Sequence, residues 1–213
     1  MSPFEIERLS LYATPLAAVA VAEAGQLNAA LAPRILQAWP QAESDGALTW
    51  MSEPKPLQAE DQPLAQLARI AGTLAEAMAA PPSWAEPGRG TWDGLWFAEA
   101  AAPGQGQPVH DFPRADWCAC YLVDDGGAGS GESGEVELLD PRGAAVLMYA
   151  PDLGFEVPGG DTLGISQTVK LASGSLLVFP AWMRQGTAVN EGSRPRLSIK
   201  LLLTRRAPAY VRR

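Results

Sequence analysis

Apolar residues with helical spacing mark two segments in the first part of the chain. Residues 24–39 carry an apolar side chain at every fourth position, which predicts an amphipathic helix. Residues 62–79 show the clearest helical pattern, with one continuous apolar stripe and Asp61 as a candidate N-cap. The double proline Pro81-Pro82 ends this second helix, because proline cannot continue it. We expect both helices to pack on the outside of a sheet.

From residue 88 onward, short apolar segments separated by Gly, Pro, Asp and Ser turns replace the helical pattern. Eight segments are predicted as strands: TWDGLWFAEA, QPVHDF, DWCACYLVDD, GEVELLD, AAVLMYA, QTVKLA, SLLVFPAW and RPRLSIKLLLT. Residues 4–22 read as extended and are broken by Pro15, and ALTWMSEPK reads as a short strand or loop. Residues 124–134 and 151–162 are predicted loops. The pattern predicts a mainly β (α+β) fold, a jelly roll or cupin-like sandwich with two N-terminal flanking helices.

Composition and charge narrow the class of protein. The 213 residues are 47% hydrophobic and 19% charged, which suits one domain over 1–213, with an N-terminal part (1–87) and a jelly-roll core (88–204). A net charge of -8 argues against binding along nucleic-acid phosphates. No apolar run is long enough to span a membrane and no signal sequence is visible, so we expect a cytoplasmic protein.

Three short motifs follow one another in an order that resembles a known family. They are Asp140-Pro141-Arg142, Phe179-Pro180-Ala181-Trp182 and Arg196-Leu197-Ser198-Ile199. Together with the N-terminal segments they make residues 8–204 similar to the bacterial family of iron(II)/2-oxoglutarate-dependent oxygenases. The resemblance implies a double-stranded β-helix with flanking helices. It also implies an iron site built from two histidines and a carboxylate on neighbouring strands.

The chain departs from this family at the metal ligands, because His110 is its single histidine. The resemblance places His110 at the first ligand position, Phe112 at the second and Gln185 at the position of the distal histidine. A phenyl ring cannot bind iron, and an amide oxygen is a poor substitute for imidazole. Asp111 is a carboxylate, but successive strand residues point to opposite faces, so only a bulge would turn it beside His110. The sequence predicts a degenerate metal triad and no catalytic residue.

The residues that the resemblance assigns to binding the co-substrate, 2-oxoglutarate, match the family better than the metal ligands do. Arg196 and Ser198 occupy the pair that the resemblance assigns to the far carboxylate of 2-oxoglutarate, and Asn190 matches a further family position. Without a metal, Arg196 could instead hold another carboxylate, such as a peptide side chain or C-terminus. The competing interpretation is that Arg196 pairs with a carboxylate of the core. Trp182 and Tyr121 complete the predicted binding cleft.

The aromatic and sulfur side chains allow two interpretations. Trp92, Trp96 and Trp117 are predicted near the mouth of the barrel, where they would suit a peptide or aromatic ligand, unless they simply fill the core. Cys118 and Cys120 share one face of a predicted strand and could bind a soft metal with His110. Buried free cysteines more commonly serve as small core residues.

Two functions from different classes follow. The first is a catalytically inactive oxygenase-like protein that uses its cleft to bind a peptide or protein, with no cofactor. Such a module could present a precursor peptide in a bacterial natural-product pathway, an analogy that rests on the fold alone. The alternative is an active iron(II)/2-oxoglutarate-dependent hydroxylase of an amino acid or peptide with an atypical ligand set. The resemblance also allows a homodimer.

Overall fold

The structure is a computed structural model that describes residues 14–39, 49–79, 91–128, 135–141, 155–157, 160–162 and 166–206. The elements are β1 (Ala17–Ala20), α1 (Ala24–Ala38), β2 (Thr49–Met51), β3 (Lys55–Pro56), α3 (Gln62–Met78), β4 (Thr91–Ala101), β5 (Trp117–Asp124), β6 (Val136–Leu139), β7 (Phe155–Val157), β8 (Gly160–Thr162), β9 (Ser166–Val169), β10 (Ser175–Pro180), β11 (Gln185–Thr187) and β12 (Arg196–Arg206).

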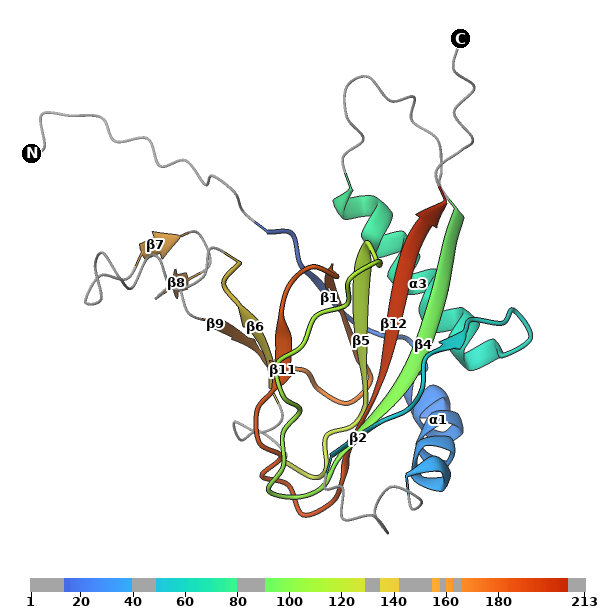
Figure 1. Cartoon of the computed structure of the whole chain (residues 1–213). Helices are drawn as coiled ribbons and strands as arrows, with labels where there is room; N and C mark the ends of the chain where they lie inside the picture. The colour runs from blue at the N-terminus through green and yellow to red at the C-terminus, as the bar shows by residue number, and fades with distance from the viewer. Residues whose placement is uncertain are drawn as a thin grey trace, which may run out of the picture.

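Antiparallel pairing organises these strands into a large sheet, a small sheet and a hairpin. The large sheet has the order β1-β10-β5-β12-β4-β2, with β3 beside β4. The small sheet has the order β11-β6-β9, and β7 pairs with β8. Neighbours in both sheets come from distant parts of the sequence, so crossing connections link the strands, as in a jelly roll. In Figure 1 the small sheet lies on one side of the large sheet and the helices lie on the other.

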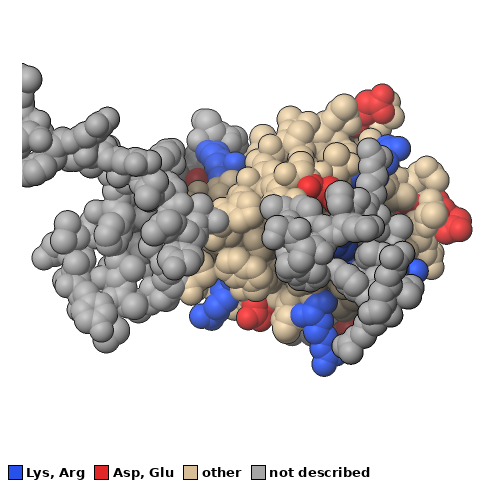
Figure 2. Space-filling view, turned by 90° about the horizontal axis from the view of Figure 1, so that it is seen from above, with Lys and Arg blue, Asp and Glu red and all other residues tan. Residues whose placement is uncertain are grey.

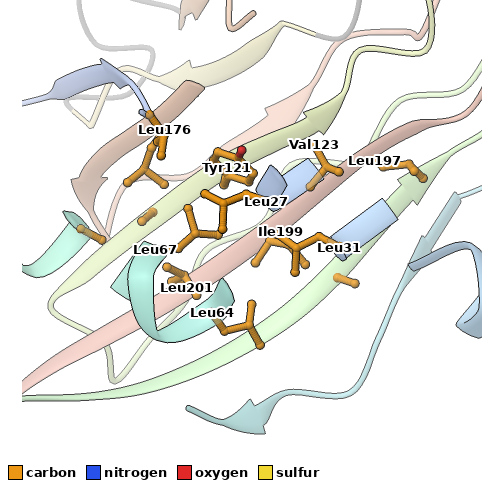
Figure 3. Close-up of a cluster of buried hydrophobic side chains, with 14 of the residues drawn as sticks. Leu27, Leu31, Leu64, Leu67, Tyr121, Val123, Leu176, Leu197, Ile199 and Leu201 are labelled. Atoms are coloured by element: carbon orange, nitrogen blue, oxygen red, sulfur yellow. The ribbon is translucent and has the colours of Figure 1, made fainter. Parts of the chain in front are cut away.

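The helices cover one face of the large sheet and form the helix-side core. Alternate residues of β5 and β12 point toward the helices, because strand side chains alternate between the two faces. Figure 3 shows how these side chains meet those of α1 and α3. The cluster includes Leu27, Leu31, Leu64, Leu67, Tyr121, Val123, Leu176, Leu197, Ile199 and Leu201. The predicted mainly β fold with flanking helices is confirmed.

The opposite face of the large sheet packs on the small sheet and forms the inner core. The other residues of β5 and β10, including Cys118, Cys120 and Phe179, meet Val136 and Leu138 of β6 there. Both sides of β5 are therefore buried, and all of its residues but the last are inaccessible. A strand buried on both faces carries a continuous apolar run, which explains the sequence WCACYLV.

Some predicted elements differ from the structure. QPVHDF is not a strand, since it contributes only an isolated bridge between His110 and Gln185. The predicted loop 151–162 contains the strands β7 and β8. β11 was not predicted at all, because three residues are too few to show an alternation. Predictions for Pro81-Pro82, for AAVLMYA and for residues 129–134 lie outside the described residues.

The predicted N-cap of the second helix has a different partner from the one expected. Asp61 stands at the N-cap position of α3, but its carboxylate accepts two hydrogen bonds from Arg34 of α1, at 3.0 and 2.6 Å. This bidentate pair holds the pKa of Asp61 below its usual value. The side chain therefore ties the two helices together.

The charged side chains are distributed without obvious segregation on the face seen in Figure 2. There the described acidic and basic residues are interspersed, and no broad basic surface is visible among them. No helix in the described part of the chain is both long and apolar enough to cross a membrane.

Candidate functional site

A row of polar side chains on β12 points into the inner core. Arg196, Ser198 and Lys200 alternate with apolar residues that face the helices, so all three lie on the side of the small sheet. We call these three residues the β12 row. Each is at most 3% exposed, although each carries polar or charged atoms. Buried groups of this kind require partners, and the partners define the candidate site.

The two family ligand positions His110 and Gln185 are brought directly opposite each other. Their backbones exchange two hydrogen bonds of 2.8 Å, from each amide to the other's carbonyl. The sequence separates these positions widely, and the fold places them side by side at the edge of the inner core.

The side chain of Gln185 is engaged by the β12 row. Its amide oxygen Oε1 accepts a hydrogen bond of 2.5 Å from Nζ of Lys200. Its amide nitrogen donates to Sγ of Cys118 at 3.5 Å. Gln185 is fully buried, so both ends of its amide face the inner core rather than solvent.

Glu99 of β4 supplies the negative charge of the site. Its Oε2 accepts a hydrogen bond of 3.0 Å from Ser198, which stands opposite it in the strand pair. The same oxygen lies 3.8 Å from Nζ of Lys200, and Oε1 lies 3.9 Å from Nε2 of His110. Glu99 thus stands between Lys200 and His110.

The charge on Lys200 is balanced by this carboxylate. Burial lowers the pKa of the Lys200 ammonium, while Cys120, Glu99 and Cys118 raise it, and the net direction is upward. Burial also raises the pKa of the Cys118 thiol to about 12, so this thiol is neutral at pH 7. Glu99 is the carboxylate at ion-pair distance from Lys200, 3.8 Å from its Nζ, and it contributes to the upward direction together with Cys120. The charged ammonium group of Lys200 is therefore buried beside the inner core.

His110 presents one ring nitrogen to the site. Its Nδ1 lies 2.7 Å from the carbonyl oxygen of Pro108, which can only accept a hydrogen bond, so Nδ1 carries the proton. In the neutral ring, Nε2 then offers a lone pair toward Glu99 Oε1. Both of these atoms are buried and have no hydrogen-bond partner. His110 Nε2 and Glu99 Oε1 face each other across the site at 3.9 Å.

The residues at the family ligand positions do not fit an iron centre of two histidines and a carboxylate. Phe112 packs its ring edge-on against His110 at 5.0 Å and against Phe97 at 5.1 Å between centroids, so it fills the second ligand position. Asp111 is exposed and does not turn inward. Gln185 is already bound to Lys200. Among the described residues, no group of three His, Cys, Asp or Glu side chains could hold a metal ion.

Arg196 has the property expected of an anion-binding residue. It is 3% exposed, and its Nε and Nη2 atoms are buried without a hydrogen-bond partner. No carboxylate of the described residues forms an ion pair with it, in contrast to Lys200. A buried guanidinium without a counter-charge is costly, so this arrangement favours an external anion.

Ser198 and Asn190 are committed to other partners. The Ser198 hydroxyl donates to Glu99 and so does not point its proton at a ligand beside Arg196. Asn190 donates from Nδ2 to the carbonyls of Ala101 and Arg194, and its Oδ1 accepts from the backbone of Gly192. Asn190 therefore shapes the turn that leads into β12.

Two further predicted cleft residues lie elsewhere. Tyr121 belongs to the helix-side core (Figure 3). Its hydroxyl donates to Oδ1 of Asn28 at 2.7 Å. Its placement in the cleft was wrong, because Tyr121 is an odd-numbered residue of β5 and faces the helices. Trp182 is 55% exposed, just beyond β10. It remains accessible to a ligand.

The tryptophans predicted at the barrel mouth also belong to the helix side. Trp117 is buried in the helix-side core, and Trp92 and Trp96 pack against it. Of the two interpretations, the structure supports the one in which they pack in the core rather than line the barrel mouth. A hollow of about 790 Å³ beside Trp92, lined by α3 residues and Leu203, is on this helix side and not at the site. Cys118 and Cys120 are free, buried and part of the inner core.

Sequence reasoning missed Glu99 and Lys200. Both follow the same signal: a single charged residue interrupts an apolar strand, as in WFAEAA and SIKLLL. Charged residues are almost never fully buried unless they are paired. Two such residues of opposite charge, on strands that are neighbours in the sheet, would have indicated an internal ion pair.

Comparison with known structures supports the fold. The chain is similar to a Pseudomonas putida prolyl-4-hydroxylase, at 17% identity and a TM-score of 0.53, with 92% of this chain and 91% of that chain covered. It is also similar to AviO1 from Streptomyces viridochromogenes, at 16% identity and a TM-score of 0.52, covering 93% and 92% of the two chains. A Trichoplax adhaerens prolyl hydroxylase in complex with a hypoxia-inducible-factor peptide fragment matches at 7% identity and a TM-score of 0.53, covering 89% and 83%.

A family model gives the assignment at the level of sequence. No curated protein matches the chain. The model described as "Putative 2OG-Fe(II) oxygenase" matches residues 94–201, which include most of β4, the His110–Gln185 bridge and the whole β12 row. This match spans just over half of the chain. The chain therefore belongs to this 2OG-Fe(II) oxygenase family.

Proposed function

We propose that the protein is a non-catalytic member of its family that binds a carboxylate-bearing ligand in the jelly roll. The observation that carries this proposal is Arg196, a buried guanidinium with two unpaired donor atoms. A guanidinium in this state matches a carboxylate, because its donors form a fork that binds both oxygens. The site needs no metal to make this contact.

The ligand positions support the non-catalytic part of the proposal. The second position is filled by the Phe112 ring, and Gln185 at the distal position is held by Lys200. Metal affinity depends on the number and type of ligands, so these replacements leave His110 as the one good iron ligand of the three. An active hydroxylase would need Asp111 beside His110, whereas Asp111 is exposed.

A peptide is the ligand class that we favour. A solved relative by fold, the prolyl hydroxylase from Trichoplax adhaerens, is in complex with a peptide fragment. An acidic side chain or a C-terminus of a peptide would supply the carboxylate for Arg196, and the exposed ring of Trp182 could contact the rest of the chain. A precursor peptide of a natural-product pathway has this chemistry, and a short peptide gene beside this one would support that source.

Calorimetric titration of the metal-free protein with glutarate and with a short Glu-containing peptide tests the proposal. We expect binding by the wild type and a loss of at least tenfold in affinity on Arg196→Leu, because a charge-assisted bidentate contact is removed. Arg206→Leu, at the far end of the same strand, is the control and should bind as the wild type does. Equal binding by both variants would contradict the proposal.

Two further readouts separate the alternatives. Without ligand, Arg196→Leu should raise the unfolding temperature, since it removes a buried unpaired charge. Anaerobic addition of iron(II) and 2-oxoglutarate should produce no visible charge-transfer band. A band that is lost on His110→Ala would establish an oxygenase with an unusual ligand set instead.

A further inference from the structure

We propose that the ammonium group of Lys200 takes the place of the metal cation and blocks a latent metal site made by His110, Glu99 and Gln185. The inference does not depend on whether a carboxylate binds Arg196. It concerns the polar cluster beside the inner core, in which Lys200 contacts Gln185 and Glu99 and Glu99 faces His110.

The three donor atoms come from β4, from β11 and from the segment before β5 that contains His110. His110 Nε2 and Glu99 Oε1 lie 3.9 Å apart, and both are buried without a hydrogen-bond partner. Two ligands that each lie about 2.0–2.2 Å from one cation can be up to about 4.2 Å apart, so these atoms could share an ion. Gln185 is paired with His110 across the bridge, and its Oε1 is the third donor.

Lys200 already satisfies two of these three groups. Its Nζ donates to Gln185 Oε1 at 2.5 Å and lies 3.8 Å from Glu99 Oε2. An ammonium and a divalent cation would repel each other strongly at such distances in a buried site. The side chain of Lys200 is 1% exposed and sits in the packed inner core, so it has no route to withdraw into solvent. We infer that Lys200 excludes divalent metal both by its charge and by occupying the Gln185 oxygen.

The latent site differs from the family's metal site in the position of its carboxylate. The carboxylate is Glu99 of β4, whereas the resemblance expects the second ligand two residues after His110, where Phe112 stands. One imidazole, one carboxylate and one amide oxygen suit a hard divalent cation such as Mn(II). The thiols of Cys118 and Cys120 nearby are soft donors, which makes Mn(II) a better probe than zinc.

Substitution of Lys200 tests the inference. Lys200→Met keeps the aliphatic length and removes the charge, so calorimetry should show Mn(II) affinity at least tenfold above that of the wild type. Mn(II) should also raise the unfolding temperature of this variant and leave that of the wild type unchanged. Lys200→Met/Glu99→Gln is the matched control, because it removes the carboxylate and leaves a neutral pair. This control should bind Mn(II) no better than the wild type.

Two results would overturn the inference. One is a Lys200→Met variant that folds and binds Mn(II) no better than the wild type. The other is equal Mn(II) binding by the single variant and the double variant, which would place the metal elsewhere. If Lys200→Met fails to fold because Glu99 is left unpaired, Lys200→Gln provides a neutral amide for Glu99 and is titrated in the same way. Absence of a gain in that variant also overturns the inference. Arg196 is intact in all these proteins, so glutarate binding can be measured separately.

Discussion

Single residues in the core show how strongly the environment of a side chain determines its role. Tyr121 and Lys200 lie on neighbouring strands and are both buried, but they face opposite sides of the large sheet. Tyr121 reaches Asn28 with its hydroxyl and otherwise contacts apolar side chains. Lys200 is surrounded by the polar groups of the site. The large sheet therefore separates a purely apolar core from one that borders an ion pair.

Tyr121 should make stability depend on alkaline pH. Burial raises its pKa from 10.0 to about 12 in the folded protein. Between these values the unfolded chain loses the phenolic proton and the folded chain keeps it, so the contribution of Tyr121 to stability is present below pH 10 and is lost as the pH rises toward 12. We expect the wild type to lose more unfolding free energy over this range than Tyr121→Phe does.

Chemical denaturation of both proteins at a series of pH values provides the measurement. Tyr121→Phe serves as the control for the wild type, because all other groups titrate equally in the two proteins. At neutral pH the variant should be less stable by about 1 kcal/mol, since it lacks the hydrogen bond to Asn28. Parallel pH curves for the two proteins would contradict the pKa shift.

Whole segments hold the site together without forming regular strands. Residues 105–110 run beside residues 185–190 through a series of backbone hydrogen bonds, of which only the His110–Gln185 pair counts as a bridge. This pairing fixes the position of His110. Gly106 allows the close approach, because a side-chain Cβ there would lie 2.4 Å from the carbonyl oxygen of Thr187.

Gly106→Ala should therefore destabilise the protein, because the clash is with backbone that cannot move aside. We expect the free energy of unfolding to fall by about 1–3 kcal/mol, as it does for other overpacking substitutions. Gly25→Ala, in α1 with open space around it, is the matched control and should stabilise by about 0.4–1 kcal/mol. Urea denaturation of both variants checks this, and equal effects would mean that the approach at Gly106 is not tight.

Elements with a long regular pattern were predictable from the sequence, and the site was predictable only in part. The helix predicted over 24–39 is α1, and the strands WCACYLV and SLLVFP are β5 and β10. The structure brings His110 and Gln185 opposite each other and buries Arg196, while the site roles that the family motifs assign to these residues stay predictions. The partners Glu99 and Lys200 were missed, because a charge inside an apolar strand has no regular pattern to reveal it. Tyr121 was misplaced because the choice of face depends on the packing of the helices.

At the scale of the whole molecule, the large sheet is shared by two cores. The helix-side core and the inner core lie on opposite faces of the same strands, so neither can lose its packing without exposing the strands of the other. The segments before and after residue 88 are also joined, since β1 pairs with β10. We expect the chain to unfold as one domain.

Leu67→Ala on the helix side and Leu177→Ala in the inner core should each lower the free energy of unfolding by about 2–5 kcal/mol, because both side chains are almost completely buried. Each variant should show one transition, at the same midpoint by far-ultraviolet and near-ultraviolet circular dichroism. A variant in which the two signals separate would show that the cores unfold independently.

The alternation along β12 also has an evolutionary consequence. Leu197, Ile199 and Leu201 hold the helices in place, while the β12 row on the other face contains the chemistry. A substitution in the β12 row changes the polar site directly and does not touch the side chains that pack on the helices, so a fold of this kind can change its ligand while it keeps its helix packing. The same separation gives a protein engineer a strand on which every second residue is available for redesign.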